Sequence, residues 1–290
     1  MSQVLKPTTD LANRIAQVYP SLSGTHRRAA DFVLQNPLET ATMTIEGFAE
    51  RSGASTATVT RFVRALGYGG YSEFRAALTA ALRLAMAPVD SLADAHSTKS
   101  SAFSTFVTAI KDQAANLDEA LAAIDEETCS RAMEALLRAR RIFIVGSGAS
   151  HHVGAHLEEG LTLYLDANVI FASSRGGPEK AIRHIMNVGA DDLVLAISLP
   201  RYSRGTVDLA KLAKSRGATV LALTDAPSSP LVPIADMTFF APARNRLLPN
   251  SPAATFALAD AIVAAVARER PDAVAALKEL SESLLWTFYQ

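Results

Sequence analysis

The stretch RIFIVGSGAS, residues 141–150, decides the architecture of the larger part of this 290-residue chain. Its first half, Arg141–Val145, is a short apolar run typical of a buried β-strand. Its second half turns at Gly146 and Gly148 and leads into a helical pattern. Four similar apolar runs follow, at Val169–Ala172, Leu193–Ile197, Thr219–Leu223 and Met237–Phe240.

Helical patterns separate most of these runs. They lie at about 151–165, 178–187 and 206–215, whereas the gap 224–236 has room only for a turn or a short helix. Strands that alternate with helices form β-α-β units, whose parallel sheet is buried on both faces. The sequence therefore predicts a doubly wound α/β domain with a five-stranded parallel sheet. Further helices are expected at about 103–124, 126–139, 252–268 and 271–287, with Pro271 in the first turn of the last one.

The chain divides near residue 90. Residues 1–87 read as an all-α domain, and the polar, aperiodic segment 88–101, PVDSLADAHSTKSS, reads as a linker or a loose helix start. Residues 102–290 then form the α/β domain. Residues 1–86 carry nine Lys and Arg against six Asp and Glu, a net charge of +3, and the remaining residues carry nineteen against twenty-three, a net charge of −4. A basic first part is a weak indication that this part faces nucleic acid.

The composition limits where the protein works. Hydrophobic residues make up 49% and charged residues 20%, which is ordinary globular usage and excludes a disordered chain. We expect no membrane helix, because no apolar run reaches roughly 18 residues, and no signal peptide, because MSQVLKPTTD has no apolar stretch. The single cysteine, Cys129, has no partner for an internal disulfide. These features predict a cytoplasmic protein.

Residues 44–66 have the pattern of a helix-turn-helix. Thr44 is a good N-cap for a helix over Ile45–Ser52, Gly53 suits the left-handed position after it, and Ser55 caps a second helix over Thr56–Leu66. In that second helix, the predicted buried stripe is Val59, Phe62, Val63 and Leu66, and the opposite face holds Ala57, Thr60, Arg61 and Arg64. A three-residue turn between such helices presents the second helix to the major groove. The alternative is an ordinary helix pair with a solvated basic face.

Two hydroxyl-rich loops follow predicted strands. Ser147, Gly148 and Ser150 come after the first strand, and Ser198, Arg201, Ser203 and Thr206 come after the third. Hydroxyls and a helix N-terminus supply hydrogen-bond donors to an anion, and ligands of open α/β sheets bind beyond the carboxyl ends of the strands. If the first and third strands are neighbours, both loops line one pocket. The alternative for each loop is simple helix capping.

The N-terminal motifs resemble those of the RpiR family of bacterial transcriptional regulators. The resemblance covers about residues 20–82 and rests on SLSGTHRRAADFVLQNP, residues 21–37, and on MTIEGFAERSGASTATVTRFVRALGYGGYSEFRAAL, residues 43–78. It implies that this part binds double-stranded operator DNA. It also implies that the recognition element comprises Ser55, Thr56, Thr60, Arg61 and Arg64.

The later motifs resemble a SIS (sugar isomerase) domain, which follows the helix-turn-helix in the same family. This resemblance spans about residues 125–245 and rests on RIFIVGSGAS, DDLVLAIS, LAKLAKSRGATVLALTD and SSPLVPIAD. It implies phosphosugar binding by Ser147, Ser150, Ser198, Ser203 and Thr206. The commoner loop is S-x-S-G-x-T, whereas Pro200, Arg201 and Tyr202 stand between Ser198 and Ser203 here. A phosphosugar is therefore the default effector, and another anionic metabolite is the alternative.

Catalysis is the competing hypothesis for the second domain. A phosphosugar isomerase with an accessory helical domain needs an acid/base group, and the candidates are His151, His152, Glu158, Glu159 and His184. We favour a regulator without enzymatic activity that assembles as a homodimer or homotetramer. We expect no metal, since no His/Cys/Asp cluster has ligand spacing. We also expect no nicotinamide cofactor, because GSGASHHVG lacks the G-x-G-x-x-G spacing.

Overall fold

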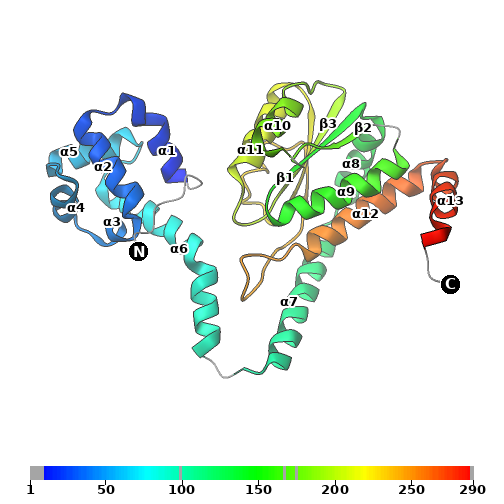
Figure 1. Cartoon of the computed structure of the whole chain (residues 1–290), viewed down its shortest axis with the longest axis horizontal. Helices are drawn as coiled ribbons and strands as arrows, with labels where there is room; N and C mark the ends of the chain where they lie inside the picture. Colours follow the sequence, from blue (N-terminus) through cyan, green and yellow to red (C-terminus); the bar gives the residue numbers. More distant parts are fainter. Residues whose placement is uncertain (1–9, 98–99, 166–167, 174–175, 288–290) are drawn as a thin grey trace. The chain divides into compact units, whose positions relative to one another are not determined.

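The computed structural model describes residues 10–97, 100–165, 168–173 and 176–287. The chain falls into two compact units, Met1–Ala93 and Asp94–Gln290 (Figure 1). The first nine residues of the predicted N-terminal domain lie outside the described part of the chain.

The first unit is helical, as predicted. Its helices are α1 (Asp10–Val18), η1 (Tyr19–Ser21), α2 (Gly24–Gln35), α3 (Pro37–Thr42), α4 (Ile45–Ser52), α5 (Thr56–Ala65) and the first part of α6 (Tyr71–Ser97). Phe48 of α4, Phe62 of α5 and Phe74 of α6 are fully buried together. The ring centroid of Phe74 lies 6.5 Å from that of Phe48 and 6.4 Å from that of Phe62. These aromatic contacts hold α4 and α5 against α6.

The segment that the sequence suggests as a linker is mostly helical. Helix α6 continues through residues 88–97, and α7 (Ala102–Ala122) begins five residues after α6 ends. Residues 98 and 99 of the expected linker lie outside the described residues. Apolar periodicity appears where a helix buries one face. In the 88–97 stretch, Asp94–His96 are exposed or half-exposed, so the sequence there shows no such periodicity.

The second unit contains the predicted five-stranded parallel sheet. Its strands are β1 (Arg141–Gly146), β2 (Asn168–Phe171), β3 (Asp192–Ser198), β4 (Thr219–Thr224) and β5 (Met237–Phe240), in the order β2-β1-β3-β4-β5. The chain passes from β1 to one side and then returns to place β3 on the other side. Strand order therefore reverses between β1 and β3, which is where ligands of such sheets bind.

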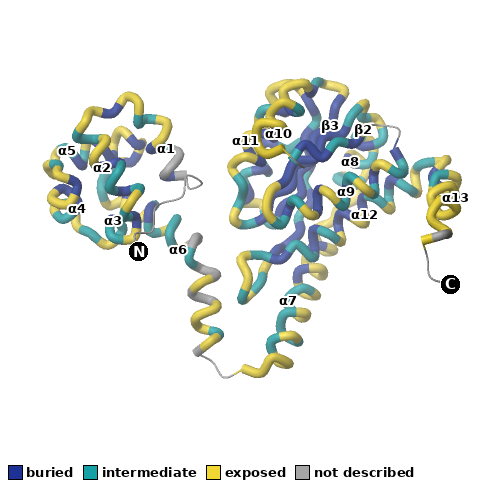
Figure 2. The backbone as a smooth tube through the Cα atoms, viewed as in Figure 1, coloured by how far each residue is buried: buried dark blue, intermediate teal, exposed yellow. Residues whose placement is uncertain are grey.

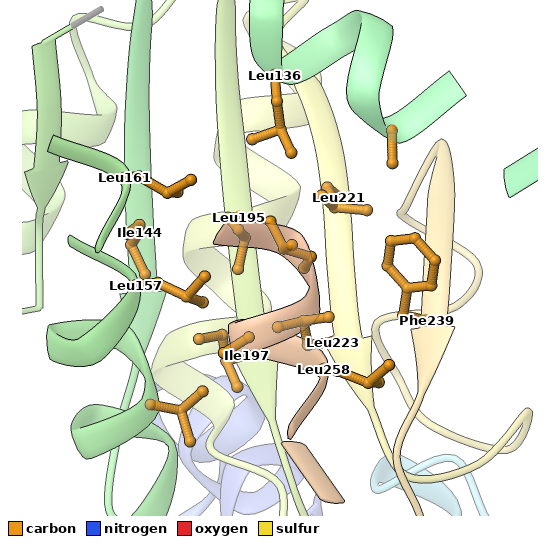
Figure 3. Close-up of a cluster of buried hydrophobic side chains, with 14 of the residues drawn as sticks. Leu136, Ile144, Leu157, Leu161, Leu195, Ile197, Leu221, Leu223, Phe239 and Leu258 are labelled. Atoms are coloured by element: carbon orange, nitrogen blue, oxygen red, sulfur yellow. The ribbon is translucent and has the colours of Figure 1, made fainter. Parts of the chain in front are cut away.

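Helices cover both faces of the sheet (Figure 1). Helices α8 (Glu126–Arg138), α9 (Ala149–Tyr164) and α12 (Ala253–Glu269) pack on one face, and α10 (Gly177–Ile185) and α11 (Arg204–Ser215) pack on the other. Successive residues of β1 alternate between the two cores, with Ile144 in the first and Phe143 in the second. Figure 3 shows Ile144, Leu195 and Leu221 side by side on the neighbouring strands β1, β3 and β4, in the first of these cores. The continuous apolar strands are therefore buried on both sides (Figure 2).

The last helix starts later than predicted. Helix α13 spans Ala273–Leu284 and is followed by η2 (Leu285–Thr287). Asp272 occupies the N-cap position, so Pro271 precedes the helix instead of lying in its first turn.

Candidate functional site

The turn between α4 and α5 has the predicted caps. Thr44 Oγ1 accepts a hydrogen bond from the Gly47 N–H at 3.2 Å, and Ser55 Oγ accepts one from the Thr58 N–H at 3.2 Å. Gly53 adopts φ 65° at the end of α4, a left-handed conformation that favours glycine. The turn geometry is thus specified by three residues that fit their backbone positions.

Helix α5 is buried on one side only. Val59, Phe62, Val63 and Leu66 are buried, as predicted. Among the residues expected to read DNA, Ser55, Thr56, Arg61 and Arg64 are exposed, while Thr60 is half-buried and its hydroxyl donates to the Thr56 carbonyl at 3.0 Å. The two arginines therefore lie on the free face of the helix, and their contact with DNA stays a prediction.

Arg28 is a residue that the sequence reasoning did not single out. Its guanidinium Nη2 lies 3.4 Å from the Gly53 carbonyl and 3.4 Å from Thr25 Oγ1, so α2 places a positive charge beside the helix-turn-helix turn. The only signal in the sequence is the His26-Arg27-Arg28 run, which by itself does not show which arginine meets the turn.

The two hydroxyl loops begin at neighbouring strands. Strands β1 and β3 are paired, with Gly146 opposite Ile197, so the loops that follow them leave the same edge of the sheet. A side chain at Gly146 would place its Cβ 2.9 Å from the Ser150 carbonyl oxygen, and Gly148 has φ 63°. These glycines let the chain turn directly from β1 into α9.

The hydroxyls of the two loops differ in exposure and partners. Ser147 and Gly148 are exposed, whereas Ser150 is buried in the first turn of α9. Ser198 is buried and its Oγ accepts from the Ser203 N–H at 3.2 Å, and Ser203 Oγ accepts from the Thr206 N–H at 3.4 Å and so caps α11. Capping therefore accounts for part of the role of Ser203. Thr206 is 1% exposed, and its hydroxyl has no hydrogen-bond partner among the described residues.

The insertion in the second loop folds toward the end of β4. The Tyr202 hydroxyl donates to Asp225 Oδ1 at 2.8 Å, and burial together with Asp225 raises the pKa of Tyr202. The Pro200 carbonyl accepts from the Asn250 side chain. Arg201 is exposed, and Arg204 pairs with Asp208 at 3.1 Å.

The candidate acid/base residues are dispersed over two helices. Glu158 on α9 accepts from the Phe171 N–H at 2.7 Å, so it caps the edge strand β2. The His151 ring lies 4.8 Å from that of Phe171, and His184 on α10 lies 6.4 Å from the Phe143 ring. His151 is the candidate nearest in sequence to the first hydroxyl loop, and Glu158 has a structural role.

A cleft of about 690 Å³ lies beyond the ends of β3, β4 and β5. Its lining includes Asp112 and Glu119 from α7, and Arg244 and Arg246 from the segment that joins β5 to α12. None of these four residues was anticipated, because the partners are separated by more than 120 positions in the chain. Within the ranges that the structure describes, no helix is long and apolar enough to cross a bilayer. No group of three His, Cys, Asp or Glu side chains in those ranges has metal-site geometry.

Comparison with known proteins matches both units. The model of the helix-turn-helix domain of the rpiR family matches residues 9–84, and the SIS domain model matches residues 135–268. The chain is 30% identical over 227 residues to the HTH-type transcriptional regulator HexR of Pseudomonas aeruginosa, covering 77% of this chain and 75% of that one. It is 27% identical over 233 residues to an uncharacterized HTH-type transcriptional regulator of Haemophilus influenzae, covering 78% of each.

Solved structures show the same fold. The sugar isomerase domain of an RpiR transcription factor from Sphaerobacter thermophilus is 31% identical with a TM-score of 0.55, covering 61% of this chain and 97% of that one. Vibrio vulnificus NanR complexed with ManNAc-6P is 24% identical with a TM-score of 0.58, covering 97% of this chain and 99% of that one. The resemblance seen in the sequence motifs is therefore confirmed, and the chain belongs to the RpiR family of helix-turn-helix transcriptional regulators with a SIS domain.

Proposed function

We propose that this regulator binds operator DNA through the exposed face of α5 and senses a small anionic metabolite at the edge of the sheet between β1 and β3. The observation that carries the sensing role is the pairing of β1 with β3 at the point where strand order reverses. Because β1 and β3 are paired, the two hydroxyl loops begin at adjacent strand ends, where ligands of open α/β sheets bind.

The proposed effector is a phosphosugar, with another anionic metabolite as the alternative. Exposed Ser147 and the backbone N–H groups at the start of α9 suit an oxyanion, because a helix N-terminus carries partial positive charge. The unpartnered hydroxyl of Thr206 offers a further donor in the second loop. NanR of Vibrio vulnificus, which has this fold, is complexed with ManNAc-6P, and this supports the phosphosugar class. Arg201 is exposed and contributes its charge to the same anion in this proposal.

The proposed DNA contacts divide into two kinds. Arg61 and Arg64 are long enough to reach base edges from the free face of α5, and arginine pairs with guanine through two hydrogen bonds. Ser55, Thr56 and Thr60 lie in the N-terminal turns of the same helix, where hydroxyls contact phosphates or the thymine methyl. Arg28, beside the turn, is placed to meet a phosphate.

We further propose a homodimer or homotetramer built through the second unit. Helix α7 exposes Phe103 (77%), Phe106 (75%) and Ile110 (68%), and α13 exposes Val274 and Leu277. Exposed apolar side chains at helical spacing mark interaction surfaces. A symmetric pair also places two recognition helices about one helical turn of DNA apart, or a multiple of it. As a DNA-binding regulator, the protein acts in the cytoplasm in this proposal.

The enzymatic alternative is tested directly against regulation. The fold is shared with a phosphoheptose isomerase from Francisella tularensis, at 15% identity and a TM-score of 0.51, with 59% of this chain and 100% of that one covered. We propose that the protein does not convert its ligand into a product. This choice is supported by Glu158, whose carboxylate already accepts a hydrogen bond from the backbone of β2. A thermal-shift screen over sugar phosphates and organic acids identifies binders, because a ligand that binds the folded state raises Tm.

Each binder is then tested in two assays. In the first, the mobility shift of DNA selected in vitro by the full chain is measured with and without the binder. In the second, the binder is incubated with the protein and its isomerised product is sought. Altered DNA affinity without product supports the regulator, whereas turnover with unchanged DNA affinity overturns it.

A further inference from the structure

Helix α7 carries an exposed apolar stripe along its whole length. Its members are large side chains that are 39–77% exposed, namely Phe103, Phe106, Ile110, Leu117, Leu121 and Ile124. Ile124 lies just beyond the helix, where its N–H still donates to the Leu121 carbonyl at 3.3 Å. At 100° per residue, the five members within α7 lie within about 60° of one another. Single exposed apolar side chains are common, whereas a continuous stripe of them marks an interaction surface.

The spacing of this stripe is symmetric along the helix. Successive members are 3, 4, 7, 4 and 3 positions apart, a series that is the same when read from either end. Its centre falls between Gln113 and Ala114, and Ala114 is small and exposed. The period of about 3.5 residues is that of two helices packed along a common seam. A second α7 that runs in the opposite direction about this centre therefore matches every member with another: Phe103 with Ile124, Phe106 with Leu121, and Ile110 with Leu117.

The charged residues of α7 fit the same arrangement. Asp112 and Glu119 are already paired with arginines of their own chain. Lys111 and Asp118, in contrast, are exposed and form no ion pair among the residues that the structure describes. Both lie about a quarter turn from the stripe, along the same edge of it.

An antiparallel pair brings these two charges together. In such a pair the same edges of the two helices meet, and charged residues beside the seam form interhelical ion pairs. The position opposite Lys111 is Asn116 of the second copy, which is two residues, or about 3 Å along the axis, from Asp118. The two-fold axis creates this ion pair twice.

A parallel pair of α7 helices does not fit in this way. It would bring the edge with Lys111 and Asp118 against the opposite edge of the second helix. That opposite edge includes Asn116 and Ala120, which are buried in their own chain, and Asn116 donates to the Arg244 carbonyl at 2.8 Å. The antiparallel direction therefore matches the charges and leaves these packed residues in place.

We propose that α7 pairs in antiparallel fashion with α7 of a second copy of this chain, through the apolar stripe and two Lys111–Asp118 ion pairs. This inference rests on the proposed self-association of the second unit and adds its surface, direction and register. The two-fold axis passes between residues 113 and 114 of both helices.

Exchange of charge between two chains tests the ion pairs. Sedimentation of the full chain at low salt measures the dimer Kd, because salt screens exposed pairs. Lys111→Asp or Asp118→Lys alone sets like charges against each other twice, so each variant's dimer Kd is expected to rise about tenfold. An equimolar mixture of the two variants should regain the wild-type Kd, because opposite charges meet again in the mixed dimer. Lys211→Asp, at an exposed position of α11, is the charge-matched control and should leave Kd unchanged.

Cysteine cross-linking in a Cys129→Ser background tests the direction and register. Ala114→Cys stands beside the two-fold axis and is expected to form an interchain disulfide on oxidation. Phe106→Cys alone should not cross-link, because its counterpart in the second copy lies 15 residues, or about 22 Å, away along the axis. A mixture of Phe106→Cys chains and Leu121→Cys chains should cross-link.

Several results would overturn the α7 pairing. These are an Ala114→Cys chain that does not cross-link, a Phe106→Cys chain that cross-links to itself, single charge variants that dimerise as tightly as the wild type, and a mixture that does not regain affinity. If the wild type still sediments as an oligomer in that case, the proposed self-association stands and uses another face, such as that of α13. A monomeric wild type at micromolar concentration would overturn both proposals.

Discussion

Arg61 and Arg64 extend from the free face of α5, and neither contributes to its buried stripe. Replacing either with alanine is expected to weaken specific operator binding by about 1–3 kcal/mol, the value of a good base contact. Tm stays near the wild-type value, because no buried contact is lost. A fluorescence anisotropy titration measures the affinity, with the exposed Arg216→Ala on the second unit as a charge-matched control. Undiminished affinity in the double variant would falsify this placement.

Ser147 and Ser203 are the residues that test the effector loops. Each is expected to lose a hydrogen bond to a charged ligand when replaced by alanine, which costs roughly 1.5–3 kcal/mol or at least a tenfold change in affinity. DNA binding without effector persists, because both residues belong to the second unit. Titrating the identified effector against the protein–DNA complex measures the response.

Helix capping complicates the Ser203 result, because its hydroxyl also accepts from the Thr206 N–H. Ser203→Asp keeps a capping oxygen but adds negative charge, so it preserves Tm and still repels an anionic effector. A Ser147→Ala variant and a Ser203→Asp variant that both respond at wild-type effector concentrations would place the pocket elsewhere.

At the scale of elements, Asp192 joins the start of β3 to β1 and to the preceding turn. Its buried carboxylate accepts from Arg141 at 2.6 Å and from the Gly189 N–H at 2.9 Å. Burial raises the pKa of Asp192, but the hydrogen bonds to Arg141 and Gly189, with the charges of Arg141 and Arg140, outweigh it and hold the pKa below its usual range. A depressed folded-state pKa contributes stability above the unfolded-state value, and this stability is lost as pH falls through the folded-state pKa.

Asp192→Asn is therefore expected to destabilise the fold at neutral pH by about 1–3 kcal/mol, the cost of losing charge-assisted hydrogen bonds to partly exposed arginines. The difference from the wild type should start to shrink below about pH 4, where the unfolded chain takes up the proton, and should be gone below the lower folded-state pKa, where the native carboxylate is protonated as well. Urea unfolding at a series of pH values measures both free energies. Asp191→Asn, which alters the exposed neighbouring carboxylate, is the matched control. A difference that is constant with pH would contradict the assigned role.

At the scale of the whole molecule, the apolar side chains on α7 predict self-association. Phe103→Glu combined with Phe106→Glu places charges on a surface that the proposed oligomer buries, so the full chain should shift toward a smaller species in analytical ultracentrifugation. Each protomer should remain folded, because the rings of Phe103 and Phe106 are both exposed. Operator affinity should fall when the protein becomes a smaller species, because a single helix-turn-helix buries little surface on DNA. Val274→Glu combined with Leu277→Glu provides the parallel test for α13. Unchanged sedimentation of both double variants would rule out the apolar faces of α7 and α13 as the oligomer interface.

Local structure was predictable where a few adjacent residues determine it. Thr44, Gly53 and Ser55 act within one turn of their own helices, so their caps could be identified from the sequence. The alternation of Ile142 to Val145 between two cores likewise follows from the pleat of one strand. The end of α6 could not be located in this way, because the residues of 88–97 whose burial the structure describes are exposed or half-exposed and form no buried apolar stripe.

The sequence by itself determined the two-part organisation, the helix-turn-helix and the parallel sheet, since these depend on short-range periodicity and on motifs. The tertiary structure alone decided that β3 lies beside β1, and so that the two hydroxyl loops start at adjacent strand ends. It also decided that Arg244 meets Glu119 across 125 positions and that Arg28 meets the carbonyl of Gly53. Such contacts depend on how distant segments pack, because strand order and side-chain proximity follow from burial of the whole apolar surface and not from any local spacing.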